Sequence, residues 1–216
     1  RYAERGIPSG SIGREGSPPN RLVFALALGT TWTATRFSDF GGMGWKGGVQ
    51  VQYQYGGRLS FGLGALLSRI EYTAGRGEYS PPKGFWTRKI APRESLGKCT
   101  VLEVPVTLGW YPKGYVRSGW FAEGGLVSYL MLRERYYYFY DETDPDLVRM
   151  WQGRNENRHW FGIGQFSLGY QQVLFGGKQS LQWAPFVQVP LAGVGHGRVR
   201  LDNIGLNLRY NFHLGH

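Results

Sequence analysis

The sequence of 216 residues has one cysteine, Cys99, and only 19% charged residues. A single cysteine excludes an intrachain disulfide and any metal site built from several cysteines. The longest apolar runs, such as LVFALALG at 22–29, fall far short of the roughly 20 residues that a transmembrane helix needs. No segment shows the 3.6-residue apolar stripe of an amphipathic helix. Any membrane crossing must therefore be made by strands.

Glycine and aromatic residues are abundant instead, with 34 glycines and 16% aromatics. This composition is too aromatic for a disordered chain and too rich in glycine for a helical one. The length favours a single domain. Residues 1–20, rich in Gly, Ser, Pro and charge, predict an extended N-terminal tail, periplasmic in an exported protein, before a folded domain at 21–214. No signal peptide is recognisable at Arg1, so an exported form is expected to have lost its signal.

Alternation of apolar and polar residues is the main structural signal. In GGVQVQYQYGG (47–57), valines and tyrosines alternate with Gln50, Gln52 and Gln54, which is the period of a strand with one apolar face. The pattern alone does not say whether the apolar face meets a core or lipid. Eight strands are predicted in this way, near 22–35, 45–55, 59–73, 100–111, 119–132, 159–174, 180–191 and 199–214.

The connections between these strands alternate in length. Gly56-Gly57-Arg58, about 112–118 and Gly176-Gly177-Lys178-Gln179 are tight, whereas about 75–99 and 133–158 are long. An up-and-down barrel places every second connection on the same rim, and outer-membrane barrels have short turns on one rim and long loops on the other. A soluble sandwich has no reason to sort its loops in this way. We therefore predict an all-β fold: an eight-stranded antiparallel up-and-down transmembrane β-barrel.

Aromatic residues gather near the strand ends, as expected for rings at the two bilayer interfaces. The set assigned to the rim with tight turns is Tyr53, Tyr55, Trp110, Tyr111, Trp120, Tyr170, Trp183, Tyr210 and Phe212. The set assigned to the other rim is Trp32, Trp45, Tyr136, Tyr138 and Trp160. With this arrangement the apolar face of each strand meets lipid and the glutamines face inward.

The last strand contains NIGLNLRYNF, in which Asn203, Gly205, Leu208 and Tyr210 have the spacing of the β-signal that the outer-membrane assembly machinery reads. LEVPVTLGWYP (102–112) and GWFAEGGLVSYLM (119–131) resemble the central strands of small outer-membrane barrels common in Bacteroidota, which have OmpA/OmpX-like architecture. Over residues 21–214 the resemblance implies an eight-stranded barrel in the bacterial outer membrane. Some members of that group, the PorT-like ones, are accessory components of secretion machinery.

The net charge of +10 raises the alternative of a nucleic-acid partner, but the cations collect in connections rather than on one element. A phosphate-rich lipid surface suits that distribution equally well. We predict no nucleic-acid binding and expect contact with lipopolysaccharide phosphates or an acidic partner. The predicted basic extracellular loop comprises Arg76, Lys83, Arg88, Lys89, Arg93 and Lys98.

Four charged residues are expected to face the lumen: Lys46, Glu103, Glu123 and Arg209. Buried charges are costly unless they are paired, and an eight-stranded barrel is only just wide enough for its own side chains. We therefore interpret these residues as a layer that closes the lumen, with Glu123 and Arg209 at a similar depth, rather than as a conduction path.

No catalytic, cofactor or metal site is predicted. His196, in the loop GVGHGR with Asp202 nearby, is the candidate for a lipid A-modifying enzyme, and a lone loop histidine is more often an ordinary surface residue. DETDPD (141–146) lacks the glycine and terminal glutamate of an EF-hand and is interpreted as a solvated loop tip. The sequence favours a non-enzymatic outer-membrane protein with a structural or partner-binding role, acting on lipid, lipopolysaccharide or other envelope proteins. A lipid A-modifying enzyme and a small-solute pore stay open.

Overall fold

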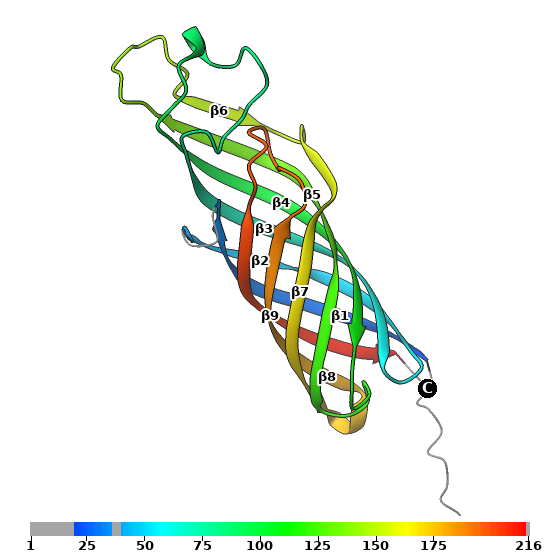
Figure 1. Cartoon of the computed structure of the whole chain (residues 1–216). Helices are drawn as coiled ribbons and strands as arrows, with labels where there is room; N and C mark the ends of the chain where they lie inside the picture. Colours follow the sequence, from blue (N-terminus) through cyan, green and yellow to red (C-terminus); the bar gives the residue numbers. More distant parts are fainter. Residues whose placement is uncertain (1–19, 36–39, 215–216) are drawn as a thin grey trace, which may run out of the picture.

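The computed structural model describes residues 20–35 and 40–214, and these form long strands with two short 3-10 turns, η1 (Thr87–Lys89) and η2 (Phe175–Gly177) (Figure 1). The predicted tail at 1–20 lies outside the described residues, except for Asn20. The strands are β1 (Arg21–Ala34), β2 (Met43–Tyr55), β3 (Leu59–Gly75), β4 (Glu94–Trp110), β5 (Gly119–Phe139), β6 (Met150–Gly153), β7 (Arg158–Leu174), β8 (Gln179–Pro190) and β9 (Asp202–Leu214).

The strands close into a barrel. Each long strand pairs antiparallel with the next, and β1 pairs with β9 from Leu22↔Leu214 to Ala34↔Asp202. β6 is a short addition that pairs with the upper part of β5. The prediction of an eight-stranded antiparallel up-and-down barrel is therefore confirmed. No helix in the described part of the chain is long and apolar enough to cross a membrane.

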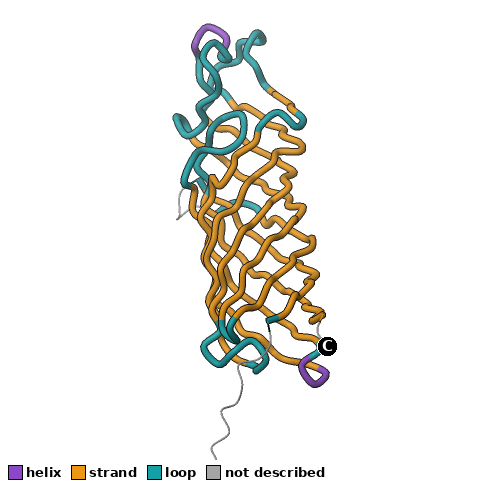
Figure 2. The backbone as a smooth tube through the Cα atoms, turned by 90° about the vertical axis from the view of Figure 1, so that its right-hand side faces the viewer, coloured by secondary structure: helices purple, strands orange, loops and turns teal. Residues whose placement is uncertain are grey.

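The connections are sorted by rim, as predicted. Residues 56–58, 111–118 and 175–178 form tight turns at one end, called here the turn rim. The connections at the other end, the loop rim, include the long segments 76–93, 140–149 and 191–201. Figure 2 shows this asymmetry, with extended loops at one end of the barrel and compact turns at the other.

The residues of β2 show which face of the strands points outward. Val49, Tyr53 and Tyr55 point outward and are 54%, 44% and 52% exposed, whereas Gln52 and Gln54 point inward and are 1% exposed. The same facing holds on β9, where Leu206 and Leu208 are exposed while Arg209 is buried. On these two strands the outside is apolar and the inside is mainly polar, which is the arrangement of a barrel that crosses a membrane.

Two belts of aromatic residues encircle the barrel and bound its apolar exterior; we call these belts the aromatic rings. Trp32, Trp45 and Trp160 are exposed towards the loop rim, and Tyr53, Tyr55, Trp110, Trp120, Trp183 and Phe212 towards the turn rim. From Trp45 to Tyr55, β2 advances by ten residue-to-residue steps, which is roughly 33 Å along the strand and about 25 Å along the axis at a tilt of about 40°. This matches the height of about 25 Å expected for the lipid-facing band of such barrels.

Three aromatic residues predicted for these rings lie inside the barrel instead. Tyr111, Tyr136 and Tyr138 are at most 2% exposed. Tyr111 follows β4 and turns into the lumen, where its ring stacks on Phe121 with 5.3 Å between centroids. Tyr136 and Tyr138 belong to an extension of β5 that the sequence interpretation had treated as loop. These three ring assignments were wrong.

Strands β4 and β5 extend further towards the loop rim than predicted. The alternation there has its apolar residues inside and its polar residues outside, the reverse of the pattern used for the prediction. Beyond the ring of tryptophans the inward residues are apolar, such as Cys99 and Tyr136, and the outward residues are charged, such as Lys98 and Arg135. A strand in water has its charged face outside, so the chain stays a strand while the apolar-out pattern ends. Lys98, assigned to the basic loop, therefore lies in β4, and that part of the prediction was wrong.

A bulge in β5 sets the facing in this upper part. Thr100 pairs with Arg133 and Val101 with Met131, so Leu132 is the extra residue. The bulge shifts the alternation by one position. Met131 and Glu134 consequently both point inward, three residues apart.

Candidate functional site

The four predicted lumen charges form two ion pairs at different depths. Arg209 donates to Glu123 at 2.8 Å, and Lys46 lies 3.2 Å from Glu103. Glu123 pairs across the sheet with Gly109, so Glu103 is six residues nearer the loop rim on β4. All four side chains are buried. The structure thus brings Glu123 and Arg209 together at one level, and Lys46 and Glu103 at another.

Aromatic rings and amides surround these pairs. The guanidinium of Arg209 lies 5.4 Å from the Phe121 ring centroid, and the Lys46 ammonium lies 3.9 Å from that of Phe186. Arg209 also donates to Gln50. Each cation therefore has both a carboxylate and an aromatic face, which reduces the cost of burying it.

The loop-rim end of the interior is an aromatic cluster, called here the mouth cluster. Its buried members with an aromatic ring or a thiol are Tyr72, Tyr79, Cys99, Tyr129, Tyr136 and Tyr138. Phe85, Trp86 and Trp151 pack against it. Tyr79 enters from the long loop, and its hydroxyl lies 2.6 Å from that of Tyr138. Loop residues thus fill the barrel mouth, and burial raises the pKa of Tyr79.

Glu134 is a buried carboxylate in the mouth cluster. It accepts hydrogen bonds from the Tyr136 hydroxyl at 2.7 Å, from the His196 backbone N–H at 2.9 Å and from the Asn157 amide. It makes no ion pair with any residue that the structure describes. Its three donors come from β5, the β6–β7 connection and the β8–β9 loop. Glu134 therefore ties the loop at 191–201 to the barrel wall, a role that the sequence interpretation missed because it placed Glu134 in a loop.

His196, the catalytic candidate, is held mainly by aromatic rings. Its imidazole stacks on Trp151 with 4.0 Å between centroids and meets the edge of Phe85 at 5.0 Å. Within the described ranges its Nε2 atom has no hydrogen-bond partner, so neither a serine nor an aspartate meets that atom. Burial lowers the pKa of His196, and the nearby carboxylates of Glu134 and Glu156 oppose that effect.

The acidic segment at 141–146 meets the basic loop. Asp141 accepts from Arg76 at 2.9 Å and from Arg93 at 3.3 Å, both on the surface. Lys83 is exposed on the same loop, and Arg88 and Lys89 lie in η1. The described residues contain no group of three or more His, Cys, Asp or Glu that could hold a metal ion.

The four residues of the proposed assembly signal lie in β9. Asn203 is buried and accepts a hydrogen bond from the Thr33 hydroxyl, while Leu208 and Tyr210 are on the outer face. A Cβ at Gly205 would lie 2.1 Å from the Thr30 carbonyl oxygen and 2.7 Å from the Phe186 ring. The absence of a side chain at Gly205 therefore allows the Phe186 ring to reach its position over Lys46. Recognition of this strand by the assembly machinery stays a prediction.

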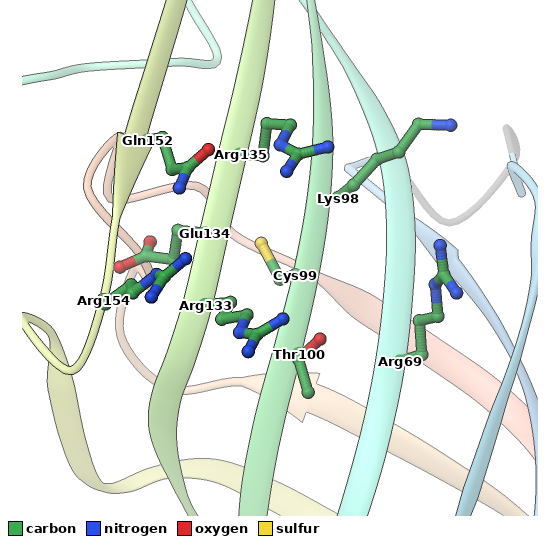
Figure 3. Close-up of a pocket in the computed structure, with 9 residues that line it drawn as sticks. All are labelled: Arg69, Lys98, Cys99, Thr100, Arg133, Glu134, Arg135, Gln152 and Arg154. Carbon is green, nitrogen blue, oxygen red and sulfur yellow. The ribbon is translucent and has the colours of Figure 1, made fainter.

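Five cations lie together on the outer wall, where the sequence interpretation saw no cluster. They are Arg69, Lys98, Arg133, Arg135 and Arg154, and they line a groove of about 230 Å³ together with Cys99, Thr100, Glu134 and Gln152. Figure 3 shows these side chains on neighbouring strands β3 to β6. Arg133 and Arg135, two residues apart, would have indicated a shared strand face had β5 been extended past residue 132. We call this set the wall cluster.

Replacing Glu134 with alanine is expected to loosen the loop at 191–201. Tyr136, His196 and Asn157 would each lose an acceptor, and hydrogen bonds to a charged group contribute about 1.5–3 kcal/mol each. Trypsin cleavage after Arg198 or Arg200 in the folded barrel should become at least about tenfold faster. Glu156→Ala, which removes an exposed carboxylate nearby, should leave the rate unchanged. Equal rates for the two variants would contradict the role assigned to Glu134.

Comparison with known proteins gives likenesses of fold. No protein-family model matches the chain, and no curated protein matches its sequence. Among solved structures, Neisserial surface protein A is 8% identical, with 88% of this chain and 96% of that chain covered and a TM-score of 0.49. Ail, the attachment invasion locus protein of Yersinia pestis, is 7% identical, with 89% and 99% covered and a TM-score of 0.46. The translocator domain of the autotransporter NalP from Neisseria meningitidis is 12% identical, with 93% and 90% covered and a TM-score of 0.32.

Proposed function

We propose that this barrel resides in the bacterial outer membrane and has a non-enzymatic, structural or partner-binding role. The observation that carries the proposal is the apolar outer band of about 25 Å between two aromatic rings, around an interior filled by paired charges. A closed, filled barrel presents two surfaces to the envelope: its lipid-facing wall and its loop rim. We assign function to these surfaces.

A role as accessory subunit of a larger envelope or secretion complex is the finer form of this proposal. It is supported by the resemblance of 102–112 and 119–131 to small outer-membrane barrels common in Bacteroidota, some of which, the PorT-like ones, are accessory components of secretion machinery. The packing of the loop rim supports it as well. The loops at 76–93 and 191–201 pack on the mouth cluster through Tyr79 and Val194, which gives the rim a fixed shape that a partner can recognise. The outer-membrane assembly machinery is the partner proposed for β9.

Purification under mild detergent tests the partner-binding role. The tagged barrel is solubilised from native envelopes, and co-purifying proteins are identified by mass spectrometry. A stoichiometric envelope protein should be recovered with the unaltered barrel and lost when residues 80–91, the tip of the long loop, are replaced by a short glycine-serine turn. Recovery of the barrel alone from crosslinked outer membranes would favour a purely structural role, and recovery from the inner membrane or cytosol would refute the localisation.

The barrel is expected not to conduct ions, which separates this proposal from the small-solute pore. Tyr111, Tyr115 and Phe121 pack together near the turn rim, and the ion pairs and the mouth cluster fill the levels above them. Planar-bilayer recordings of the purified protein should show no stable channels. Steady, large conductance from the unaltered protein would instead favour the pore.

The enzyme alternative is less well supported. It requires a serine or aspartate at hydrogen-bond distance from His196, and the described ring contacts of His196 are with Trp151 and Phe85. A hydrolase needs its base oriented by a hydrogen-bonded third group, and no described residue meets the Nε2 atom of His196. Unchanged lipid A on incubation with the reconstituted barrel is the expected result.

A further inference from the structure

We propose that the wall cluster is a binding site for the phosphate groups of the glycolipid in the outer leaflet. This inference rests on the proposed outer-membrane location and adds a specific site to it. The cluster lies on the barrel wall and is distinct from the loop at 76–93, since Lys98, which the sequence analysis assigned to the basic loop, is in β4.

Strand register places the cluster directly above the lipid-facing band. Leu67, Leu102 and Leu130 pair across β3, β4 and β5 and form one outward aliphatic row. The next outward row towards the loop rim pairs Arg69 with Thr100, and Thr100 in turn with Arg133. The change from leucine to arginine therefore occurs within one row, about 5 Å along the axis.

The belt of Trp32, Trp45 and Trp160 near the loop rim gives an independent marker of the boundary between lipid and water. Trp45 pairs with Arg69 across β2 and β3, so the row of Arg69, Thr100 and Arg133 continues from a residue of the aromatic ring near the loop rim. Strand tilt raises each successive position of this row by about 3 Å. Arg69 lies just above Trp45, and Arg133 lies higher, at the level where lipid headgroups begin.

A second row of polar side chains lies above the first. Glu71 pairs with Lys98, Lys98 with Arg135, and Arg135 with Gln152 of β6. Arg154 follows β6 directly and lines the same groove. The two rows form a patch on the outer face of four strands. Figure 3 shows the members of this patch other than Glu71.

The patch has a large excess of positive charge. Lys98 is 3.1 Å from Glu71. Arg69, Arg133, Arg135 and Arg154 make no ion pair with any residue that the structure describes. Glu134 also lines the groove but accepts hydrogen bonds from Tyr136, His196 and Asn157, so the patch holds five cations and two carboxylates. This excess of positive charge at one edge of an apolar band attracts anions from outside the chain.

Phosphate esters carried on an acylated sugar fit both parts of this surface. Guanidinium groups bind phosphate oxygens with two parallel N–H donors, and the Thr100 hydroxyl and Gln152 amide add further donors. The acyl chains of the same molecule would lie against the leucine row below. A phosphate group free in solution could use the cations but would gain nothing from the leucine row, so the lipid is the ligand we assign.

The test compares double variants that each remove two positive charges from the full-length barrel in phosphatidylcholine nanodiscs. Binding of bis-phosphorylated lipid A is measured by native mass spectrometry over a concentration series. Arg133→Gln/Arg135→Gln should weaken binding about 10- to 30-fold, since a cation near an anionic lipid surface contributes about a factor of five. Arg58→Gln/Lys113→Gln, at the exposed turn rim, should change it less than about twofold. Arg133→Lys/Arg135→Lys, which keeps the charge, should retain most of the affinity.

Two further arms identify the ligand. Dephosphorylated lipid A should bind no better to the unaltered barrel than to the Arg133→Gln/Arg135→Gln variant, and millimolar inorganic pyrophosphate should compete only weakly. Equal binding of the wall and turn-rim variants would overturn the proposal, as would full competition by pyrophosphate. A loss confined to Lys83→Gln/Lys89→Gln would move the site to the loop and leave the proposed function intact. Failure of the unaltered barrel to insert into nanodiscs would refute the proposed function itself.

Discussion

Replacing Arg209 with alanine is expected to lower the free energy of unfolding of the barrel by about 3–5 kcal/mol. The variant leaves the Glu123 carboxylate buried without its partner at 2.8 Å, and it also removes the contacts of the guanidinium with Gln50 and the Phe121 ring. An unpaired ion in a narrow lumen has no compensating charge and little water around it. Equilibrium unfolding by guanidinium chloride in phospholipid vesicles, followed by tryptophan fluorescence, measures the change in the free energy of unfolding.

The matched control is the double variant Arg209→Met/Glu123→Leu. Replacement of a buried ion pair by apolar side chains of similar volume is often neutral for stability, so most of the loss should be recovered. Arg209→Ala should also be the variant that introduces small, flickering conductance in planar bilayers, because it opens space beside Phe121. A single variant as stable as the unaltered barrel would show that the pair does not stabilise the lumen.

The substitution Val49→Arg is expected to make the free energy of folding into the membrane less favourable by about 2–4 kcal/mol, the cost of placing a cation near the bilayer midplane. Val49 points outward and lies four residues from Trp45 and six from Tyr55 on β2, near the middle of the apolar band. Folding into phospholipid vesicles is measured by the mobility shift of unheated samples in gel electrophoresis and by the urea midpoint. The folded fraction should fall at equal lipid and urea concentrations.

The control places the same side chain outside the band. Val116 is exposed in the tight turn at 111–118, so Val116→Arg should fold as the unaltered chain does. If Val116→Arg were the more damaging change, the lipid-facing band would have been placed on the wrong part of the wall. If both were harmless, the outer face of β2 would not contact lipid.

Prediction from sequence succeeded where alternation has a constant polarity. On β2 and on β9 from Asn203 onward, the apolar residues are outside and the polar ones inside, so the facing followed directly from the residues. The predicted limits of 45–55 and 199–214 differ from the observed ones only at the loop-rim ends, Met43 and Asp202. On β4 and β5 the polarity reverses at the tryptophan ring, and the strands were ended too early for that reason. Tyr136 was assigned to lipid because an aromatic residue near a strand end usually lies at the interface, whereas here it is in the aqueous part of the barrel, packed inside.

The candidate sites show the same limit. That Glu123 and Arg209 would meet could be inferred from their depths on two assigned strands. The partner of Lys46 could not, because its depth relative to Glu103 depends on the shear of the closed sheet rather than on either strand alone. The wall cluster and the carboxylate of Glu134 depend on the same extension of β5 and on the bulge at Leu132, which no local pattern marks.

The reversal of polarity at Trp45 also bears on how the barrel responds to bilayer thickness. Sinking by one outward row would bring Arg69 into hydrocarbon, and rising by one row would expose Leu67 to water. Both displacements are only about 5 Å, and both are costly on the same side of the barrel. The chain is therefore expected to keep a fixed depth, so that in membranes thicker or thinner than its band the surrounding lipid deforms while the barrel does not shift.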